Sequence, residues 1–139
     1  MKVSYSSDSA PSATLSRHGL RVLLVYPNTR DVAMANLGFQ QVYSLLNQIE
    51  GVECDRYAFP VGWKPETQSL SREAMRSMDS QKHPLDFDVI AFSISFEPDY
   101  LNAVLALKYF GIPLDREARD ASHPMITAGG SAIFINPEP

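Results

Sequence analysis

Cysteine is scarce in this chain of 139 residues, and basic residues are fewer than acidic ones; each of these features excludes a class of protein. The one cysteine, Cys54, excludes an internal disulfide and any metal or iron–sulfur site built only from cysteines of this chain. The 16 acidic residues outnumber the 12 basic ones, for a formal net charge of −4, so we expect no nucleic-acid groove. No hydrophobic run reaches membrane-spanning length, and residues 1–19 lack the apolar core of a secretory signal. We therefore expect a cytoplasmic protein without a membrane partner.

Short runs rich in β-branched residues alternate with segments of helical periodicity after a serine-rich start. Residues 1–19 are polar and predict a flexible N-terminal arm. Strands are predicted at 21–26, 52–59, 88–96 and 125–128, and longer helices at 31–50 and 98–110. A short helix at 65–72 and a short strand at 75–78 are the expectation for the middle of the chain. The mixed polarity of 52–59 predicts a strand near the edge of the sheet.

The apolar spacing also predicts which helix faces are buried. In the first helix, one stripe is shared by Val42, Leu45, Leu46 and Ile49. The second helix is mostly apolar, and we expect it to be well buried through residues that include Leu101, Val104 and Leu105. The simplest interpretation of Cys54 is a small strand residue that faces the core.

This order of elements predicts an α/β fold with a doubly wound, mainly parallel sheet over residues 20–139. In such folds, ligands bind beyond the carboxyl ends of the strands. Three loops follow those ends at 27–30, 93–97 and 129–136. They supply the candidate ligand-binding residues Asn28, Thr29, Arg30, Ser93, Ser95, Glu97, Gly129, Gly130, Ser131 and Asn136.

The first of these loops excludes several familiar sites. It lacks glycine, which disfavours a dinucleotide fingerprint, a P-loop and a flavin mononucleotide site of flavodoxin type. It also lacks the aspartate that a phospho-acceptor domain places at the end of its first strand. The three histidines, His18, His83 and His123, fall in the arm or in loops, so we assign no catalytic or metal-binding residue.

The candidate residues also have plain structural interpretations. Glu97 is an acid at a helix start, where a negative charge is favourable without any ligand. Ser93 and Ser95 can simply alternate across the sheet and satisfy nearby backbone groups. The pair Gly129 and Gly130 can be a tight turn, although the polar residues that follow favour a functional loop.

The end of the chain carries the most specific pattern. An apolar strand runs into Gly129 and Gly130, and the sequence Asn-Pro-Glu from Asn136 is typical of a helix start. No helix follows it in this sequence. We therefore expect the chain to stop before the last helix and strand of its fold.

Two segments carry a resemblance to a known family. The first is DFDVIAFSISFE from Asp86, followed by a helix that ends in YFGIP. The second is HPMITAGG from His123, in which Gly-Gly is followed after six residues by Pro-Glu. From Arg21 to the end, and most specifically over 86–139, the chain resembles the N-terminal, cobalamin-binding-like domain of certain radical S-adenosylmethionine (SAM) proteins.

The resemblance implies a Rossmann-like or flavodoxin-like cobalamin-binding fold that holds a corrinoid over the C-terminal ends of its strands. It also implies a barrel domain in cis that binds a 4Fe–4S cluster and S-adenosylmethionine through cysteines this chain lacks. The domain would then be an accessory one, without a catalytic centre of its own.

Two alternatives stay open. The cobalt-coordinating histidine motif of methionine-synthase-like domains is missing from the first loop, and Ala132 stands where cobalamin-using relatives commonly have histidine. The domain could therefore be a structural interface module of the same enzyme class that binds no corrinoid, or an unrelated α/β domain that binds a small regulatory ligand. An incomplete sheet would expose an edge and an apolar face, so we expect the chain to form a homodimer or to cover that face with its N-terminal arm.

Overall fold

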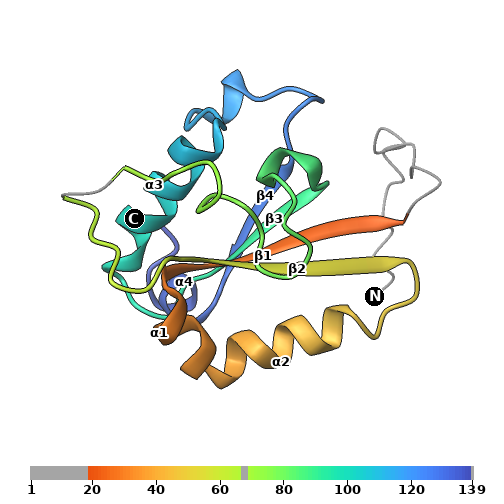
Figure 1. The fold of residues 1–139 in the computed structure, drawn as a ribbon, viewed down its shortest axis with the longest axis horizontal. Helices are drawn as coiled ribbons and strands as arrows, with labels where there is room; N and C mark the ends of the chain where they lie inside the picture. The colour runs from red at the N-terminus through yellow and green to blue at the C-terminus, as the bar shows by residue number, and fades with distance from the viewer. Residues whose placement is uncertain (1–18, 67–68, 139) are drawn as a thin grey trace, which may run out of the picture.

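The computed structural model describes residues 19–66 and 69–138 (Figure 1). The expected flexible arm at 1–19 therefore lies outside the described residues, except for Gly19. In chain order the regular elements are β1 (Leu20–Thr29), α1 (Arg30–Ala35), α2 (Leu37–Leu46), β2 (Val52–Phe59), η1 (Pro84–Asp86), β3 (Val89–Ser93), α3 (Asp99–Phe110), η2 (Arg116–Ala118), β4 (Met125–Gly129) and α4 (Ser131–Ile135).

The four strands form one parallel sheet in the order β2-β1-β3-β4. This arrangement confirms the doubly wound α/β fold that the alternation of elements predicts. The chain leaves β1 toward β2 on one side and leaves β3 toward β4 on the other. The direction of winding therefore reverses between the carboxyl ends of β1 and β3, which is where such folds bind ligands.

Helices cover the two faces of the sheet unequally. The α1–α2 pair lies against one face, over β1 and β2, whereas α3 packs on the opposite face (Figure 1). The larger core cluster, on the α3 side, includes Leu23, Tyr57, Ile90 and Phe110. The smaller cluster, on the α2 side, is built around Tyr26 and Phe39 and takes in the buried Cys54 where the sequence places it.

The expected helix at 31–50 is wrong in two respects. Asn36 adopts an extended backbone and divides the segment into α1 and α2, and α2 ends at Leu46 rather than at Glu50. The Asn36 side chain accepts a hydrogen bond from the Phe39 N–H at 2.9 Å, which caps the N-terminus of α2. Asn36 stands within an apolar pattern of helical spacing, but it is the N-cap of α2 and not an interior residue of one long helix.

The buried stripe of α2 also differs from the expectation. Val42, Leu45 and Ile49 are exposed, whereas Phe39 is fully buried and Tyr43 and Leu46 pack against its cluster. The apolar residues of this helix form two neighbouring stripes, and the stripe with the aromatic rings buries the larger area. The helix is therefore rotated so that the stripe with Val42 and Leu45 faces outward.

A similar correction applies to α3, which the sequence predicts to be well buried throughout. Its buried apolar positions are Ala103, Ala106, Leu107 and Phe110, at helical spacing, while Leu101 and Val104 are exposed. The helix ends as predicted at Gly111, which has a left-handed backbone with φ 77°.

The middle of the chain contains neither the short strand expected at 75–78 nor, in its described part, the helix expected at 65–72. The segment instead covers the outer edge of β2, because the Met78 N–H donates to the Arg56 carbonyl at 2.8 Å and Asp79 accepts from the Arg56 N–H at 2.9 Å. The predicted edge position of β2 is confirmed. Trp63 is buried and stacks on Phe59 with ring centroids 3.8 Å apart.

Two boundaries near the strand ends also differ from the expectation. β3 stops at Ser93 rather than at Phe96, because the chain then turns toward the start of α3. The loop expected after Gly129 contains the short helix α4, and Asn136 follows its last residue. No helix of the described residues is long and apolar enough to cross a membrane.

The two stripes of α2 generate a test of its orientation. Phe39→Ala should lower the free energy of unfolding by about 3–5 kcal/mol, because it empties a fully buried aromatic site. Leu45→Ala, on the stripe that the sequence assigned to the core, should change it by about 0.5 kcal/mol or less, since that side chain is 54% exposed. Urea unfolding measures both variants, and equal losses would contradict the observed orientation.

Candidate ligand groove at the strand ends

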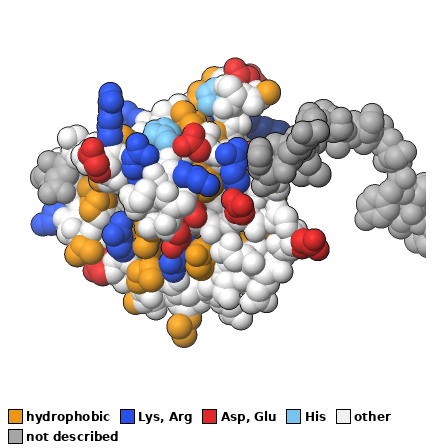
Figure 2. Space-filling view, turned by 45° about the vertical axis from the view of Figure 1, so that its right-hand side comes forward, with side chains coloured by type: hydrophobic (Ala, Val, Ile, Leu, Met, Phe, Trp, Pro, Cys, Tyr) orange, Lys and Arg blue, Asp and Glu red, His pale blue; other side chains and the backbone are white. Residues whose placement is uncertain are grey.

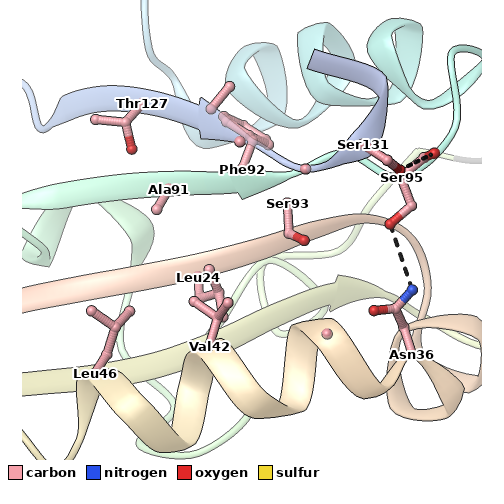
Figure 3. A pocket seen from close by; sticks show the side chains of 14 residues that line it. Leu24, Asn36, Val42, Leu46, Ala91, Phe92, Ser93, Ser95, Thr127 and Ser131 are labelled. Atoms are coloured by element: carbon pink, nitrogen blue, oxygen red, sulfur yellow. Dashed lines mark hydrogen bonds between the residues drawn. The ribbon is translucent and has the colours of Figure 1, made fainter. Parts of the chain in front are cut away.

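A groove of about 580 Å³ runs between α2 and the adjoining face of β3 and β4 (Figure 3). We call it the strand-end groove, because it reaches the carboxyl ends of those strands. None of its lining residues carries a charge. They are Leu24, Asn36, Gly38, Val42, Leu46, Ala91, Phe92, Ser93, Ser95, Thr127, Ala128, Gly129, Gly130 and Ser131.

The groove exists because α2 covers only part of its face of the sheet. Side chains alternate along a strand, so Ala91 and Ser93 of β3 lie on the α2 face, as do Thr127 and Gly129 of β4. All four are small, and the two on β4 are exposed. Figure 3 shows Val42 and Leu46 on the facing side of α2. One wall of the groove is therefore formed by Val42 of the outward stripe together with Leu46, which also packs against the Phe39 cluster.

Polar groups gather at the end of the groove nearest the strand ends. The Asn36 amide Nδ2 lies 3.5 Å from the Ser95 hydroxyl and 3.4 Å from the Tyr26 hydroxyl. The Ser131 hydroxyl donates to the Ser95 carbonyl at 3.0 Å. These contacts, two of which are drawn in Figure 3, link α2, the loop after β3 and the start of α4. The groove thus combines apolar walls with a corner of hydroxyl and amide groups.

The two adjacent glycines have different physical roles. Gly130 has φ 112°, and a Cβ atom on it would lie 2.4 Å from the Ile94 carbonyl oxygen, so the fold itself requires glycine there. Gly129 has an ordinary strand backbone, and a Cβ atom on it would meet no atom within 4 Å. Nothing in the described domain therefore requires Gly129 to lack a side chain. What its small size provides is open space in the groove.

The structure brings together half of the residues that the sequence proposes for ligand binding. Ser93, Ser95, Gly129, Gly130 and Ser131 line the strand-end groove. The others lie outside its lining, and their surroundings are described next.

Asn28 and Thr29 end β1, and Arg30 is exposed at the start of α1. Glu97 is exposed in the loop before α3. The backbone carbonyl of Asn136 accepts a hydrogen bond from the Tyr100 hydroxyl at 2.5 Å, so this residue anchors the end of α4.

Asp99 is a buried acid at the strand ends that the sequence analysis passed over. It is the first residue of α3 and is 3% exposed, and its Oδ1 accepts from Asn28 Nδ2 at 2.9 Å. This bond joins the end of β1 to the start of α3 across the point where the winding reverses. Its Oδ2 is buried without a hydrogen-bond partner among the described residues. Burial raises the pKa of Asp99, against the lowering effect of hydrogen bonds from Asn28 and Asn102.

Several groove residues were missed because their sequence signals were assigned to the core. Val42 and Leu46 belong to a helical stripe, and a stripe alone cannot show which of two faces is covered. Asn36 did carry a usable signal, since asparagine favours N-caps over helix interiors. Ala91 and Thr127 are unremarkable strand residues, and only the sheet order places them side by side.

Outside the groove, the described residues show neither a metal-binding cluster nor a reactive thiol. They contain no group of three or more His, Cys, Asp or Glu residues that could hold a metal ion. Burial raises the pKa of the Cys54 thiol to about 12, which makes it unreactive. On the face shown in Figure 2, basic and acidic side chains are interspersed rather than gathered by sign.

A comparison with protein families identifies the class of protein. The model of the N-terminal region of radical SAM proteins matches residues 38–139, and the chain belongs to this family. The matched range includes all of α2 but its first residue, together with β3, β4 and α4, and with them most of the strand-end groove. Searches of curated proteins and of solved structures returned no match.

The different roles of the two glycines predict different costs of substitution. Gly130→Ala should lower the free energy of unfolding by about 2–4 kcal/mol, because a strained backbone and a clash with Ile94 coincide. Gly129→Ala should change it by about 0.5 kcal/mol or less, since the added methyl group enters open space. Chemical denaturation of both variants measures these changes in the free energy of unfolding. A large loss of stability in the Gly129→Ala variant would show that the groove is closed.

The buried Asp99 predicts a pH dependence. Because its folded pKa lies above the ordinary value of 3.8, the native state holds its proton more tightly, and stability from this group is lost as pH rises through the folded pKa. Asp99→Asn keeps an acceptor for Asn28 and removes the charge. Its unfolding free energy relative to the parent should therefore increase between pH 4 and pH 7. A difference that stays constant across that range would contradict a raised pKa.

Proposed function

We propose that this N-terminal domain of a radical SAM protein holds a corrinoid at the carboxyl ends of its strands, with the corrinoid's lower nucleotide tail in the strand-end groove. The radical SAM catalytic domain in cis would contribute the opposite wall, together with the 4Fe–4S cluster and S-adenosylmethionine that the family implies. The role of the chain would then be to bind and orient a cofactor.

The open space at Gly129 is the observation that carries this proposal. A glycine that neither the backbone nor the packing requires fits a site that a bound molecule approaches closely. The groove volume of about 580 Å³ lies within the range of about 300–1,000 Å³ that is common for small-molecule sites. Its uncharged, mainly apolar lining suits a flat heterocycle better than a free phosphate.

Individual residues have plain roles in such a site. Leu24, Val42 and Leu46 would pack against the flat faces of the tail, and the hydroxyls of Ser93 and Thr127 would hydrogen-bond its polar atoms. A bound corrinoid would supply the radical or group-transfer chemistry of its cobalt. Among the described residues no histidine lines the groove, so these residues offer no imidazole ligand to that metal.

A second candidate function is an interface module that binds no corrinoid, and a specific surface favours it. Exposed apolar side chains lie close in sequence to residues of the groove: Leu37 is 84% exposed and Phe134 is 92% exposed, and Phe96 and Ile135 are exposed as well. Leu37 and Phe96 directly follow the groove residues Asn36 and Ser95, and α4 carries Phe134 and Ile135. Exposed apolar residues that gather in this way mark an interaction site, for which the catalytic domain in cis is the natural occupant.

Titration with hydroxocobalamin tests the proposal and separates the two candidates. The chain should retain the corrinoid through desalting, and binding should shift the visible absorption spectrum of the corrinoid. Gly129→Val should weaken this binding at least about tenfold, because the branched side chain fills the groove. Ala118→Val is the matched control, since it adds apolar bulk at an exposed site in η2 that is not part of the groove lining.

Two other outcomes have defined meanings. Binding that is equally strong in the Gly129→Val variant would place the corrinoid outside the groove and contradict the proposal. No retention by this chain, or by a longer chain that includes the catalytic domain, would leave the interface function as the better account.

A further inference from the structure

A second, charged pocket lies where the loop after α3 enters β4, and we call it the arginine pocket. It has a volume of about 570 Å³. It shares no residue with the strand-end groove, because it takes the first two residues of β4 and the groove takes the last three. Its lining residues are Arg116, Arg119, Asp120, His123, Pro124, Met125 and Ile126.

The local fold of this loop places its two arginines on one face. The Asp115 carboxylate accepts a hydrogen bond from the Glu117 N–H at 3.0 Å and so caps the short helix η2. The Arg119 N–H then donates to the Arg116 carbonyl at 3.1 Å. Residues three apart in such a turn lie one above the other, so both arginine side chains reach the same pocket.

Arg119 is held in position by neutral groups. Its Nε donates to the Pro113 carbonyl at 2.8 Å, and its Nη2 donates to the Leu114 carbonyl at 2.8 Å. These two carbonyls orient the guanidinium without neutralising its charge. Among the described residues its Nη1 has no hydrogen-bond partner. A side chain that is ordered before a ligand arrives loses less conformational entropy on binding.

The neighbouring acids leave both arginines unpaired. Within the described part of the chain, neither Arg116 nor Arg119 forms an ion pair. Asp120 lines the pocket, but its Oδ1 accepts from the N–H and the hydroxyl of Ser122 at 2.8 and 2.5 Å. The same oxygen lies 3.0 Å from the Nδ1 of His123, so Nε2 is the ring nitrogen left for a ligand. The pocket therefore offers two guanidinium groups and one imidazole nitrogen.

We propose that the arginine pocket binds the phosphate group of a small organic molecule. Two guanidinium groups offer more donors than the two oxygens of a carboxylate can use, whereas a phosphate monoester presents three acceptor oxygens and a charge of about −1.5 to −2. Pro124, Met125 and Ile126 supply the apolar part of the lining, and Met125 is 61% exposed. The organic part of the ligand would pack against Met125, beside the bound phosphate.

Calorimetric titration with phenyl phosphate tests the proposal. The parent chain should bind this probe saturably. Arg116→Gln should raise the dissociation constant at least about tenfold, because it removes one charged donor to the phosphate. The Arg116 side chain makes no hydrogen bond within the described domain, so this variant should fold normally. Arg72→Gln is the matched control, since it removes the same charge at an exposed site outside the pocket.

A second variant tests where the organic part of the ligand lies. Phenyl phosphate should bind the parent chain at least about threefold more tightly than inorganic phosphate does, because its ring covers Met125. Met125→Ala should remove this preference and leave the affinity for inorganic phosphate unchanged. A preference that survives in the Met125→Ala variant would contradict this placement of the ligand.

Three other results would overturn the proposal. The first is that neither phosphate binds the parent chain saturably. The second is an equal loss of affinity in the Arg116→Gln and Arg72→Gln variants, which would show only a general attraction between opposite charges. The third is binding by this chain but not by a longer chain that includes the catalytic domain, which would assign the pocket to an acidic side chain of the protein itself. None of these readouts involves a corrinoid.

Discussion

The capping of α2 by Asn36 is the interaction on which the functional end of this domain depends. By accepting a hydrogen bond from the Phe39 N–H, the Asn36 side chain ends α1 and starts α2 in a new direction. The buried Phe39 then holds α2 over β1 and β2, in contact with Tyr26. The α2 face of β3 and β4 is left without a helix, and the strand-end groove, its apolar wall and the bare β4 strand all follow from that incomplete coverage.

The same strand ends contain two independent sets of restraints. On the α2 side, Asn36, Ser95 and Ser131 connect three segments around the mouth of the groove. Nearer α3, the bond between Asn28 and Asp99 fixes the turn after β1 to the first residue of the helix. The positive φ of Gly130 belongs to the same architecture, because the close approach to Ile94 places α4 beside the groove. The loops that would meet a corrinoid or a catalytic domain are thus held by the fold before any partner binds.

Much of the fold was predictable from sequence, because buried parallel strands such as β1 and β3 leave continuous apolar runs and Gly111 marks a helix end. The groove was only half predictable. Ser93, Ser95, Gly129, Gly130 and Ser131 were found because strand ends are recognisable, whereas Val42 was assigned to the core and is exposed. Apolar residues at helical spacing show that one face of a helix is apolar, but they do not show whether another element covers that face. Sheet order and helix rotation decide that, and both arise from contacts far apart in the chain.

The central claim is that the strand-end groove is a ligand site, and the most direct measurement is a two-dimensional amide NMR spectrum of the labelled chain during addition of hydroxocobalamin. The account predicts that shifts concentrate on groove residues of β3 and β4, such as Ser93, Thr127 and Gly129, and on Val42 of α2. Amides of β2 and the C-terminal half of α3 should stay unchanged. Shifts confined to those other elements, or none at saturating corrinoid, would contradict it.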